Sequence, residues 1–296
     1  MLLVLLTGTL AFTVAQQVDT TLNVGRSQRI DVNAYGGEIR VQAWNRNAVR
    51  VEASTANQDQ VEVSSSPVAV SIRTHGRHGP PEEINLRISA PPWMTLRLSG
   101  VNTSVKVDGV RASISVETVE GEVDVSGGEG LISLRSVQGS VKLRGAKGRI
   151  NVNSVNEDVD VLNSSGDVAA QTVNGNITMQ VVDASSVDAS TVNGDISYSG
   201  PIRSGGRYAL STHNGDLALT VAEGTSASVA VSTFSGEFES EFPVPFRGTQ
   251  KGKGFNFTLG SGSAQVTLES FQGTIRLVRP GSEQDPARRR HDHDED

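Results

Sequence analysis

Apolar and polar residues alternate along most of this chain. Val, Ile and Leu occupy every second position in short segments such as 123–125, 141–143 and 159–161. A period of two is the pattern of a β-strand, because successive side chains of a strand point to opposite faces. The apolar residues are mostly aliphatic, and aromatic residues make up only 4% of the chain. The pattern therefore predicts an all-β protein with an aliphatic core.

A short unit recurs eight times. It reads Ser or Thr, an apolar residue, Asn, Gln or Glu, then Gly, and a strand follows it. The copies begin at Thr118, Ser136, Ser154, Thr172, Thr191, Thr212, Thr233 and Ser270. Glu157 alone replaces the glycine at the fourth position. Fourth positions are 18 residues apart from 121 to 175, then 19 and 21 apart, and the last gap is 37 residues. That gap is close to two units, so we expect that one coil there has drifted out of the pattern.

Two architectures fit such a repeat. Asn-Gly between alternating apolar segments is a strong hairpin signal, which favours a β-meander folded as a sandwich or barrel. In a parallel β-solenoid, each coil stacks on the previous one at ~4.8 Å, so equivalent positions touch and form ladders of like residues. A meander does not require Ser or Thr at all eight first positions. We therefore predict a single-chain parallel β-helix with coils of 18–21 residues.

The chain divides into four predicted regions. Residues 1–15 are apolar with small residues before Gln16, and we expect a signal peptide, with a buried N-terminal strand as the alternative. Residues 16–98 are strand-like but do not follow the repeat period, and predict an N-terminal β cap that covers the open first coil. Residues 99–279 form the predicted solenoid, and residues 280–296 a disordered charged tail. No later segment is apolar enough to span a membrane, so an exported protein of the periplasm or cell surface is expected.

Composition and charge remove several function classes. The chain has no cysteine, which excludes disulfides, thiolate metal sites and a cysteine nucleophile. Its net charge of −7 disfavours binding to nucleic acid or anionic lipid. No nucleophile elbow, phosphate-binding loop or dinucleotide fingerprint occurs. The five histidines (His75, His78, His213, His291 and His293) are scattered. We therefore predict no catalytic, cofactor-binding or metal site.

One set of polar residues could either form a carboxylate site or simply close the corners of the coils. The position after the repeat glycine holds Glu122, Ser140, Asp158, Asn176, Asp195, Asp216, Glu237 and Thr274. Stacked carboxylates would raise one another's pKa or attract Ca²⁺. The favoured interpretation is that they are corner residues facing water. The final six residues could likewise bind a divalent metal loosely, but a solvated acidic tail is favoured.

Two further sets are apolar. Seven of the eight phenylalanines lie late in the chain, at Phe234, Phe238, Phe242, Phe246, Phe255, Phe257 and Phe271. We expect them to plug the terminal coils, with a ligand-stacking platform as the alternative. The second position of the repeat holds Val119, Val137, Val155, Val173, Val192, His213, Phe234 and Phe271. If these side chains point outward, they suit partner binding. We favour a place in the core, because an exposed apolar stripe promotes aggregation.

The Thr-Val-Asn-Gly-Asp-Ile unit at residues 191–196, the Gly-Gly-Glu-Ile-Arg-Val segment at residues 36–41 and the apolar N-terminus carry a resemblance. Over roughly residues 20–279 the chain resembles the bacterial putative-adhesin domain family of unknown function. This resemblance implies a β-helical envelope or secreted protein and brings no catalytic residue with it. Glu157 and the irregular stretch between Gly236 and Gly273 depart from the pattern, and the latter leaves room for an insertion or a binding loop.

The sequence thus predicts a non-enzymatic exported β-solenoid that acts as an adhesin-like binding protein or an envelope scaffold. Its expected partner is a surface or envelope ligand, either a glycan or a protein. The competing hypothesis is a carbohydrate-active β-helix enzyme, because many such enzymes place carboxylates and basic residues together in a cleft beside the coils. We expect no cleft of that kind.

Overall fold

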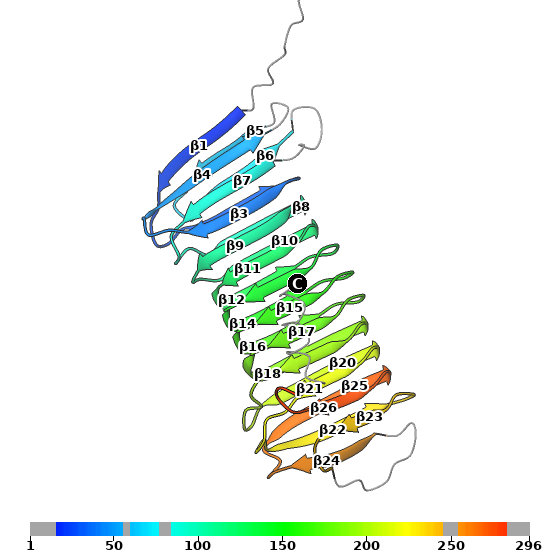
Figure 1. The fold of residues 1–296 in the computed structure, drawn as a ribbon. Helices are drawn as coiled ribbons and strands as arrows, with labels where there is room; N and C mark the ends of the chain where they lie inside the picture. Colours follow the sequence, from blue (N-terminus) through cyan, green and yellow to red (C-terminus); the bar gives the residue numbers. More distant parts are fainter. Residues whose placement is uncertain (1–15, 56–59, 77–83, 245–253, 283–296) are drawn as a thin grey trace, which may run out of the picture.

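A computed structural model describes residues 16–55, 60–76, 84–244 and 254–282. Within these residues there are 26 strands and no helix, and the strands form two sheets of 13 strands each (Figure 1). The strands of each sheet lie side by side along a rod, and the two sheets face each other. The predicted all-β solenoid is confirmed. The predicted signal peptide and nearly all of the predicted tail lie outside the described residues.

One coil contributes one strand to each sheet. In the first regular coil, β10 (Ile114–Glu120) lies in one sheet and β11 (Val123–Gly127) in the other. The next coil, β12 (Glu129–Arg135) and β13 (Val141–Arg144), runs parallel to it and places Ile132 beside Ile114 and Val141 beside Val123. The same register continues through β14 (Lys147–Asn153), β15 (Val159–Leu162), β16 (Ser165–Gln171), β17 (Ile177–Gln180), β18 (Asp183–Asn193), β19 (Ile196–Ser199), β20 (Arg207–Asn214) and β21 (Leu217–Thr220). Like residues therefore stack on like residues, as the repeat predicts.

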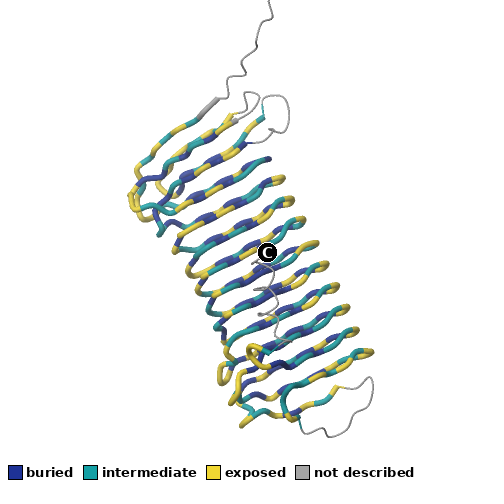
Figure 2. The backbone as a smooth tube through the Cα atoms, viewed as in Figure 1, coloured by how far each residue is buried: buried dark blue, intermediate teal, exposed yellow. Residues whose placement is uncertain are grey.

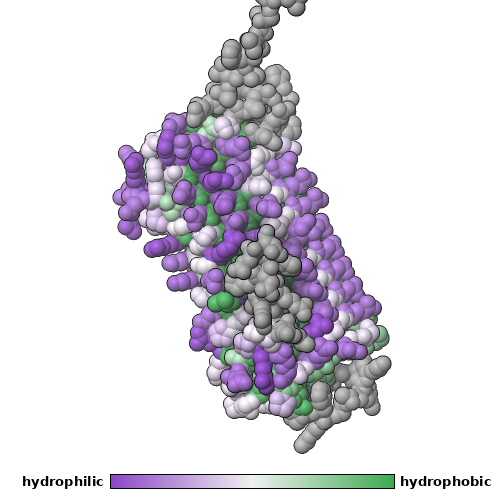
Figure 3. Space-filling model, viewed as in Figure 1, coloured by the Kyte–Doolittle hydropathy of each residue, from purple (hydrophilic) through white to green (hydrophobic). Residues whose placement is uncertain are grey.

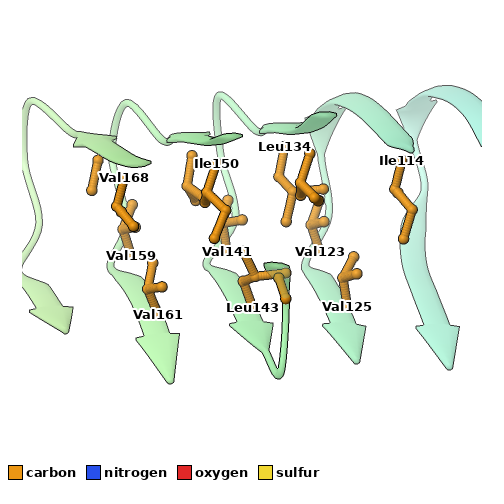
Figure 4. Close-up of a cluster of buried hydrophobic side chains, with 14 of the residues drawn as sticks. Ile114, Val123, Val125, Leu134, Val141, Leu143, Ile150, Val159, Val161 and Val168 are labelled. Carbon is orange, nitrogen blue, oxygen red and sulfur yellow. The ribbon is translucent and has the colours of Figure 1, made fainter. Parts of the chain in front are cut away.

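The core is a single aliphatic column between the two sheets. Figure 2 shows buried and more exposed positions alternating along much of the stack. Figure 4 shows the inward side chains of successive coils, such as Ile114, Leu134 and Ile150 from one sheet facing Val123, Val141 and Val159 from the other. Each of these six side chains is at most 1% exposed. Every coil thus buries apolar surface against its two neighbours, which is how a long regular stack gains stability without disulfides.

The N-terminal end begins the parallel stack earlier than the repeat suggests. β2 (Arg29–Ala34) lies between β6 (Ala69–His75) and β8 (Leu96–Asn102), and all three are parallel. In the other sheet, β3 (Glu38–Ala43) lies between β7 (Ile84–Ala90) and β9 (Ser104–Val110). The antiparallel strands β1 (Gln16–Asn23), β4 (Ala48–Thr55) and β5 (Gln60–Ser65) complete this end. The sheets run without a break from the predicted cap region into the repeat region.

At the C-terminal end the order along the chain differs from the order in space. The last coil, β25 (Ala264–Gln272) and β26 (Ile275–Val278), lies between the coil of β20 and β21 and the coil of β22 (Ala227–Thr233) and β23 (Phe238–Ser240). β24 (Phe255–Leu259) pairs antiparallel with β22. The expectation of a drifted coil in the 37-residue gap is therefore wrong. The gap contains an antiparallel edge strand, and the chain then returns to insert its last coil one position inward.

Part of the phenylalanine cluster caps this end. Phe238 lies 5.0 Å from Phe255 and 5.8 Å from Phe257, measured between ring centroids, and Phe257 is buried. The Arg279 guanidinium lies over the Phe242 ring at 5.3 Å. The expected plug is confirmed for these four rings, because they close the aliphatic column where no further coil follows. Phe246 lies outside the described residues, and Phe234 and Phe271 lie elsewhere.

Candidate functional site

The corner that joins the two strands of each repeat is built on a ladder of buried hydroxyls. Each Ser or Thr at the first repeat position, from Thr118 to Thr212 and again at Ser270, is at most 6% exposed. Its hydroxyl donates a hydrogen bond to the carbonyl of the fourth repeat residue on the preceding coil. For Thr172 this acceptor is the Glu157 oxygen at 3.0 Å, and for Thr191 it is the Gly175 oxygen at 3.0 Å. The hydroxyl ladder thus fastens each corner to the corner beneath it.

Replacing Thr172 by valine should test this ladder. The change keeps the shape of the side chain but removes the donor, so the Glu157 carbonyl loses the hydrogen bond from this buried hydroxyl. We expect a loss of about 1–2 kcal/mol of stability in chemical denaturation. Thr172→Ser is the matched control, since serine fills this position at Ser136 and Ser154, and it should lose much less. Equal losses in the two variants would show that the hydroxyl contributes nothing.

The second repeat position points outward. Val119, Val173 and Val192 are 40–44% exposed, and Phe234 is 65% exposed. The prediction that this stripe belongs to the core is wrong. The hydroxyl residue just before it continues the inward phase of the strand, so with a period of two the next side chain must face solvent. Val101, at 46%, extends the stripe by one coil, because Gly100 and Asn102 pair with Thr118 and Glu120. We call the side chains at this position the corner stripe. In spatial order they are Val101, Val119, Val137, Val155, Val173, Val192, His213, Phe271 and Phe234.

The corner stripe becomes aromatic in the last coils. The His213 and Phe271 rings stack at 4.5 Å with an interplanar angle of 11°, and Phe271 and Phe234 stack at 4.7 Å and 4°. The order in space is 213, 271, 234, because the last coil inserts between the other two. The spacing of the rings is close to the distance between neighbouring strands, so each coil supplies one ring of the column. Sequence reasoning found these residues but could not place them next to one another.

A ladder of amides runs beside the corner stripe at the third repeat position. Asn174 donates from Nδ2 to Oδ1 of Asn156 at 3.0 Å, Asn193 to Asn174 at 2.8 Å, and Asn214 to Asn193 at 2.8 Å. All four side chains are exposed. Asn174 and Asn193 each use one donor and one acceptor within the ladder, Asn156 only accepts and Asn214 only donates, so all four amides retain hydrogen-bonding capacity toward solvent.

The residues after the repeat glycine cap the neighbouring coil. In each case the side-chain Oδ1 accepts a hydrogen bond from the backbone amide of the equivalent residue on the next coil. Asp158 accepts from Asn176 (2.7 Å), Asn176 from Asp195 (2.9 Å), Asp195 from Asp216 (2.8 Å) and Asp216 from Thr274 (2.7 Å). These contacts favour the structural interpretation of this set over a catalytic one. The described residues contain no group of three or more His, Cys, Asp or Glu side chains arranged to hold a metal ion.

Asp216 is the most strongly held member of this set. Partial burial raises the pKa of its carboxyl, but the Thr274 amide and the Arg276 guanidinium at 2.7 Å outweigh that effect and hold the pKa below its ordinary value. A carboxylate that stays ionised and engaged in this way is a poor proton donor.

Two hollows in the surface have the size of small-ligand sites. One of about 670 Å³ lies on the outer face of the sheet that holds β2, β6, β8 and β10, and its lining includes Asp31, Arg73, Arg97 and Glu117. The other, of about 440 Å³, lies beside the aromatic column of the corner stripe. The expectation that no cleft brings carboxylates and basic side chains together is wrong for the first hollow. On the face shown in Figure 3, hydrophilic side chains dominate, and hydrophobic ones are visible both over the N-terminal strands in the upper part and at the lower end, where the last coils lie.

The two carboxylates of the first hollow lie on strands that are not neighbours. Asp31 lies two strands from Glu117 and two residues away along the strand direction, so their Cα atoms are about 12 Å apart by ordinary sheet dimensions. Asp31 also forms an ion pair with Arg29 at 2.8 Å.

Comparison with protein families assigns this chain to a family. The family model called Toastrack DUF4097 matches residues 27–278, which is nearly the whole described stack. The chain belongs to the Toastrack DUF4097 family. Its match begins before β2 and ends with β26, so the family unit includes the parallel coils at both ends. No match is found among curated proteins.

Several solved structures share the Toastrack likeness at low identity. A putative adhesin from Bacteroides fragilis is 13% identical with a TM-score of 0.45, covering 90% of this chain and 99% of its own. A putative lipid binding protein from Parabacteroides distasonis is 10% identical with a TM-score of 0.39, covering 88% and 96%. A putative cell adhesion protein from Clostridium sporogenes is 9% identical with a TM-score of 0.24, covering 90% and 100%. At these values the likenesses say nothing about what this chain binds.

In the part of the chain that the structure describes, no helix has the length and apolar character needed to cross a membrane.

Proposed function

We propose that this Toastrack protein is a non-enzymatic, adhesin-like binding protein of the cell envelope or surface. The corner stripe is its binding surface, and a surface glycan or protein is its partner. The single observation that carries this proposal is an outward-facing apolar position that continues from coil to coil, exposed at Val119, Val173 and Val192 and half-buried at Val137 and Val155. Contiguous exposed apolar surface is typical of interaction sites. Export is supported by the apolar residues 1–15.

Fold stability alone does not explain the apolar residues of the stripe. The Val173 side chain faces solvent while the neighbouring Thr172 hydroxyl is buried, so the polarity pattern is inverted at this corner. Threonine has a similar shape and a similar preference for strands, and would serve the backbone equally well. Retaining valine at an exposed position promotes aggregation unless a partner covers it. Many protein interfaces have an apolar centre surrounded by a polar rim. The amide ladder beside the corner stripe would supply such a polar edge.

The competing enzymatic function has less support. The Asp ladder is engaged in capping backbone amides, and Asp31 is engaged in an ion pair with Arg29. No other observation in the described residues favours catalysis over binding.

The test is binding of residues 16–296 to arrays of glycans and envelope proteins, with substrate turnover assayed in the same wells. Val173→Lys is expected to weaken binding by about tenfold or more, while stability changes by less than about 1 kcal/mol because the site is on the surface. Val173→Ile should keep both binding and stability. Asp158→Asn retains the Oδ1 acceptor and, together with Asp195→Asn, should leave binding unchanged. Turnover that these two asparagine variants abolish would contradict the proposal and support an enzyme.

A further inference from the structure

The aromatic column at the end of the corner stripe has one open face. Phe271 is covered on both sides, by His213 and by Phe234. Phe234 is the outermost of the three rings, and within the described residues no ring stacks on its other side. It is also the most exposed of the large apolar residues in the stripe, at 65%. Within the described residues, the column thus ends in an exposed aromatic face on which no other ring is stacked.

The hollow of about 440 Å³ runs alongside these three rings. Its other lining residues include three polar side chains from adjacent strands, Ser211 of β20, Glu269 of β25 and Ser232 of β22, which are register partners across the sheet. The structure gives none of the three a hydrogen-bond partner within the described residues. The hollow therefore combines an aromatic wall with a row of free hydroxyl and carboxylate groups, one group from each strand.

We propose that this hollow binds a neutral oligosaccharide, with one pyranose ring stacked on the open face of Phe234. That ring would become the next member of the column, with its C–H face on the aromatic ring. Because Ser232 and Ser211 lie two strands apart, hydroxyls of the adjoining sugar residues would hydrogen-bond to Ser232, Glu269 and Ser211 along the hollow. This inference rests on the proposed binding function and names the ligand class for one end of the corner stripe.

The lining favours a saccharide over an aromatic side chain of a protein. Both ligands could stack on Phe234, but an aromatic side chain presents apolar edges to its surroundings. The row formed by Ser211, Glu269 and Ser232 would then lose water without gaining hydrogen bonds, which is unfavourable. A pyranose has one apolar face and a rim of hydroxyls, so it matches both the wall and the polar row. The volume is within the range of small-ligand sites.

The test uses residues 16–296 and three defined probes, cellohexaose, chitohexaose and mannohexaose, with binding measured by calorimetry and by saturation-transfer NMR. At least one probe should bind saturably. Phe234→Ala should weaken that binding by about tenfold, since a stacked aromatic contact contributes on this order. Phe234→Leu should weaken it similarly, because the variant keeps apolar bulk but lacks the ring. Glu269→Ala should weaken it to a lesser extent.

Val68→Ala is the matched control, since it removes exposed apolar surface outside the corner stripe and should bind as the unmodified chain does. Equal unfolding midpoints of all variants will establish that folding is intact. The inference is overturned if no probe binds, or if Phe234→Ala binds as tightly as Val68→Ala. It is also overturned if Phe234→Ala abolishes only a concentration-dependent self-association, because the partner of the ring is then a second copy.

The two proposals fail in different ways. Array binding that Val173→Lys weakens but Phe234→Ala preserves would overturn the saccharide inference and leave the proposed function intact. Turnover that the Asp158 and Asp195 variants abolish would overturn the proposed function instead.

Discussion

A chain that ends at Gly260 is expected to fold with β22 and β23 moved one position inward, onto β20 and β21. The deletion removes β25 and β26, on which β22 and β23 stack. It would leave the inward residues Tyr208 and Leu210 without the covering coil that Val266 and Leu268 now provide. β22 has the same alternation of inward apolar residues as the missing β25, because its Val229 and Val231 stack on Val266 and Leu268 in the full chain. These two valines could therefore cover Tyr208 and Leu210. Residues 221–226 are long enough to allow the shorter connection.

This rearrangement can be measured by disulfide trapping, because the chain has no cysteine of its own. Ser211 and Ser232 are both register partners of Glu269, so in the full chain they lie two strands, or ~9.6 Å, apart. In the truncated chain they should become neighbours at ~4.8 Å, within the range that a disulfide spans. We expect Ser211→Cys with Ser232→Cys to form a crosslink only after truncation, as seen by mass spectrometry.

The positive control is Ser211→Cys with Glu269→Cys in the full chain, where the two positions are already neighbours. The truncated chain should also unfold at a lower denaturant concentration, since each coil adds its own interface to the stability of a stack. Loss of hydrogen-exchange protection in residues 227–240, without crosslinking, would show that the outer coil unfolds rather than moves.

Gly166→Ala is expected to destabilise the protein by about 3 kcal/mol or more. A Cβ atom at this corner would lie 2.0 Å from the Gly148 carbonyl oxygen, and the residue has a φ of +121°. The substitution therefore combines a backbone collision with an unfavourable conformation, each of which costs about 1–3 kcal/mol. Chemical denaturation followed by circular dichroism will measure the loss.

Gly145→Ala separates the two contributions. Gly145 also has a positive φ, of +68°, but a Cβ atom there would meet nothing within 4 Å. Only the conformational cost applies, so the expected loss is about 1 kcal/mol. Equal losses in the two variants would mean that the coils can separate freely at Gly166. The next coil shows how the backbone accommodates a side chain at this corner. Ala184 occupies the position equivalent to Gly166, and the register shifts by one residue just after it.

Much of the fold could be predicted because its rules are local. The period of two gave the strands, and the recurrence of Ser or Thr, Asn and Gly predicted a parallel stack with like residues in contact. Two N-terminal copies of the unit were missed, at residues 34–37 and 100–103, because they lack the Ser or Thr and the Asn-Gly pair. The aromatic plug was predicted as a group, yet Phe234 and Phe271 belong to the surface.

The candidate site was less predictable. The residues of the corner stripe could be read from the repeat, but their outward direction depends on the buried hydroxyl ladder. The hydrogen bond from Thr172 to the Glu157 carbonyl fixes that direction, and it exists only once one coil lies on another.

The sequence by itself determined the strands, the repeat and the contacts of like with like, because each coil is specified by the residues that touch its immediate neighbour at ~4.8 Å. Only the tertiary structure decided which coils lie next to each other at the two ends of the stack. At both ends the strands present nearly the same alternating faces, so local pattern cannot choose among them. The choice depends on the whole stack, through the antiparallel edge strands and the aromatic plug that close it. The juxtaposition of His213, Phe271 and Phe234 is the direct result of that choice.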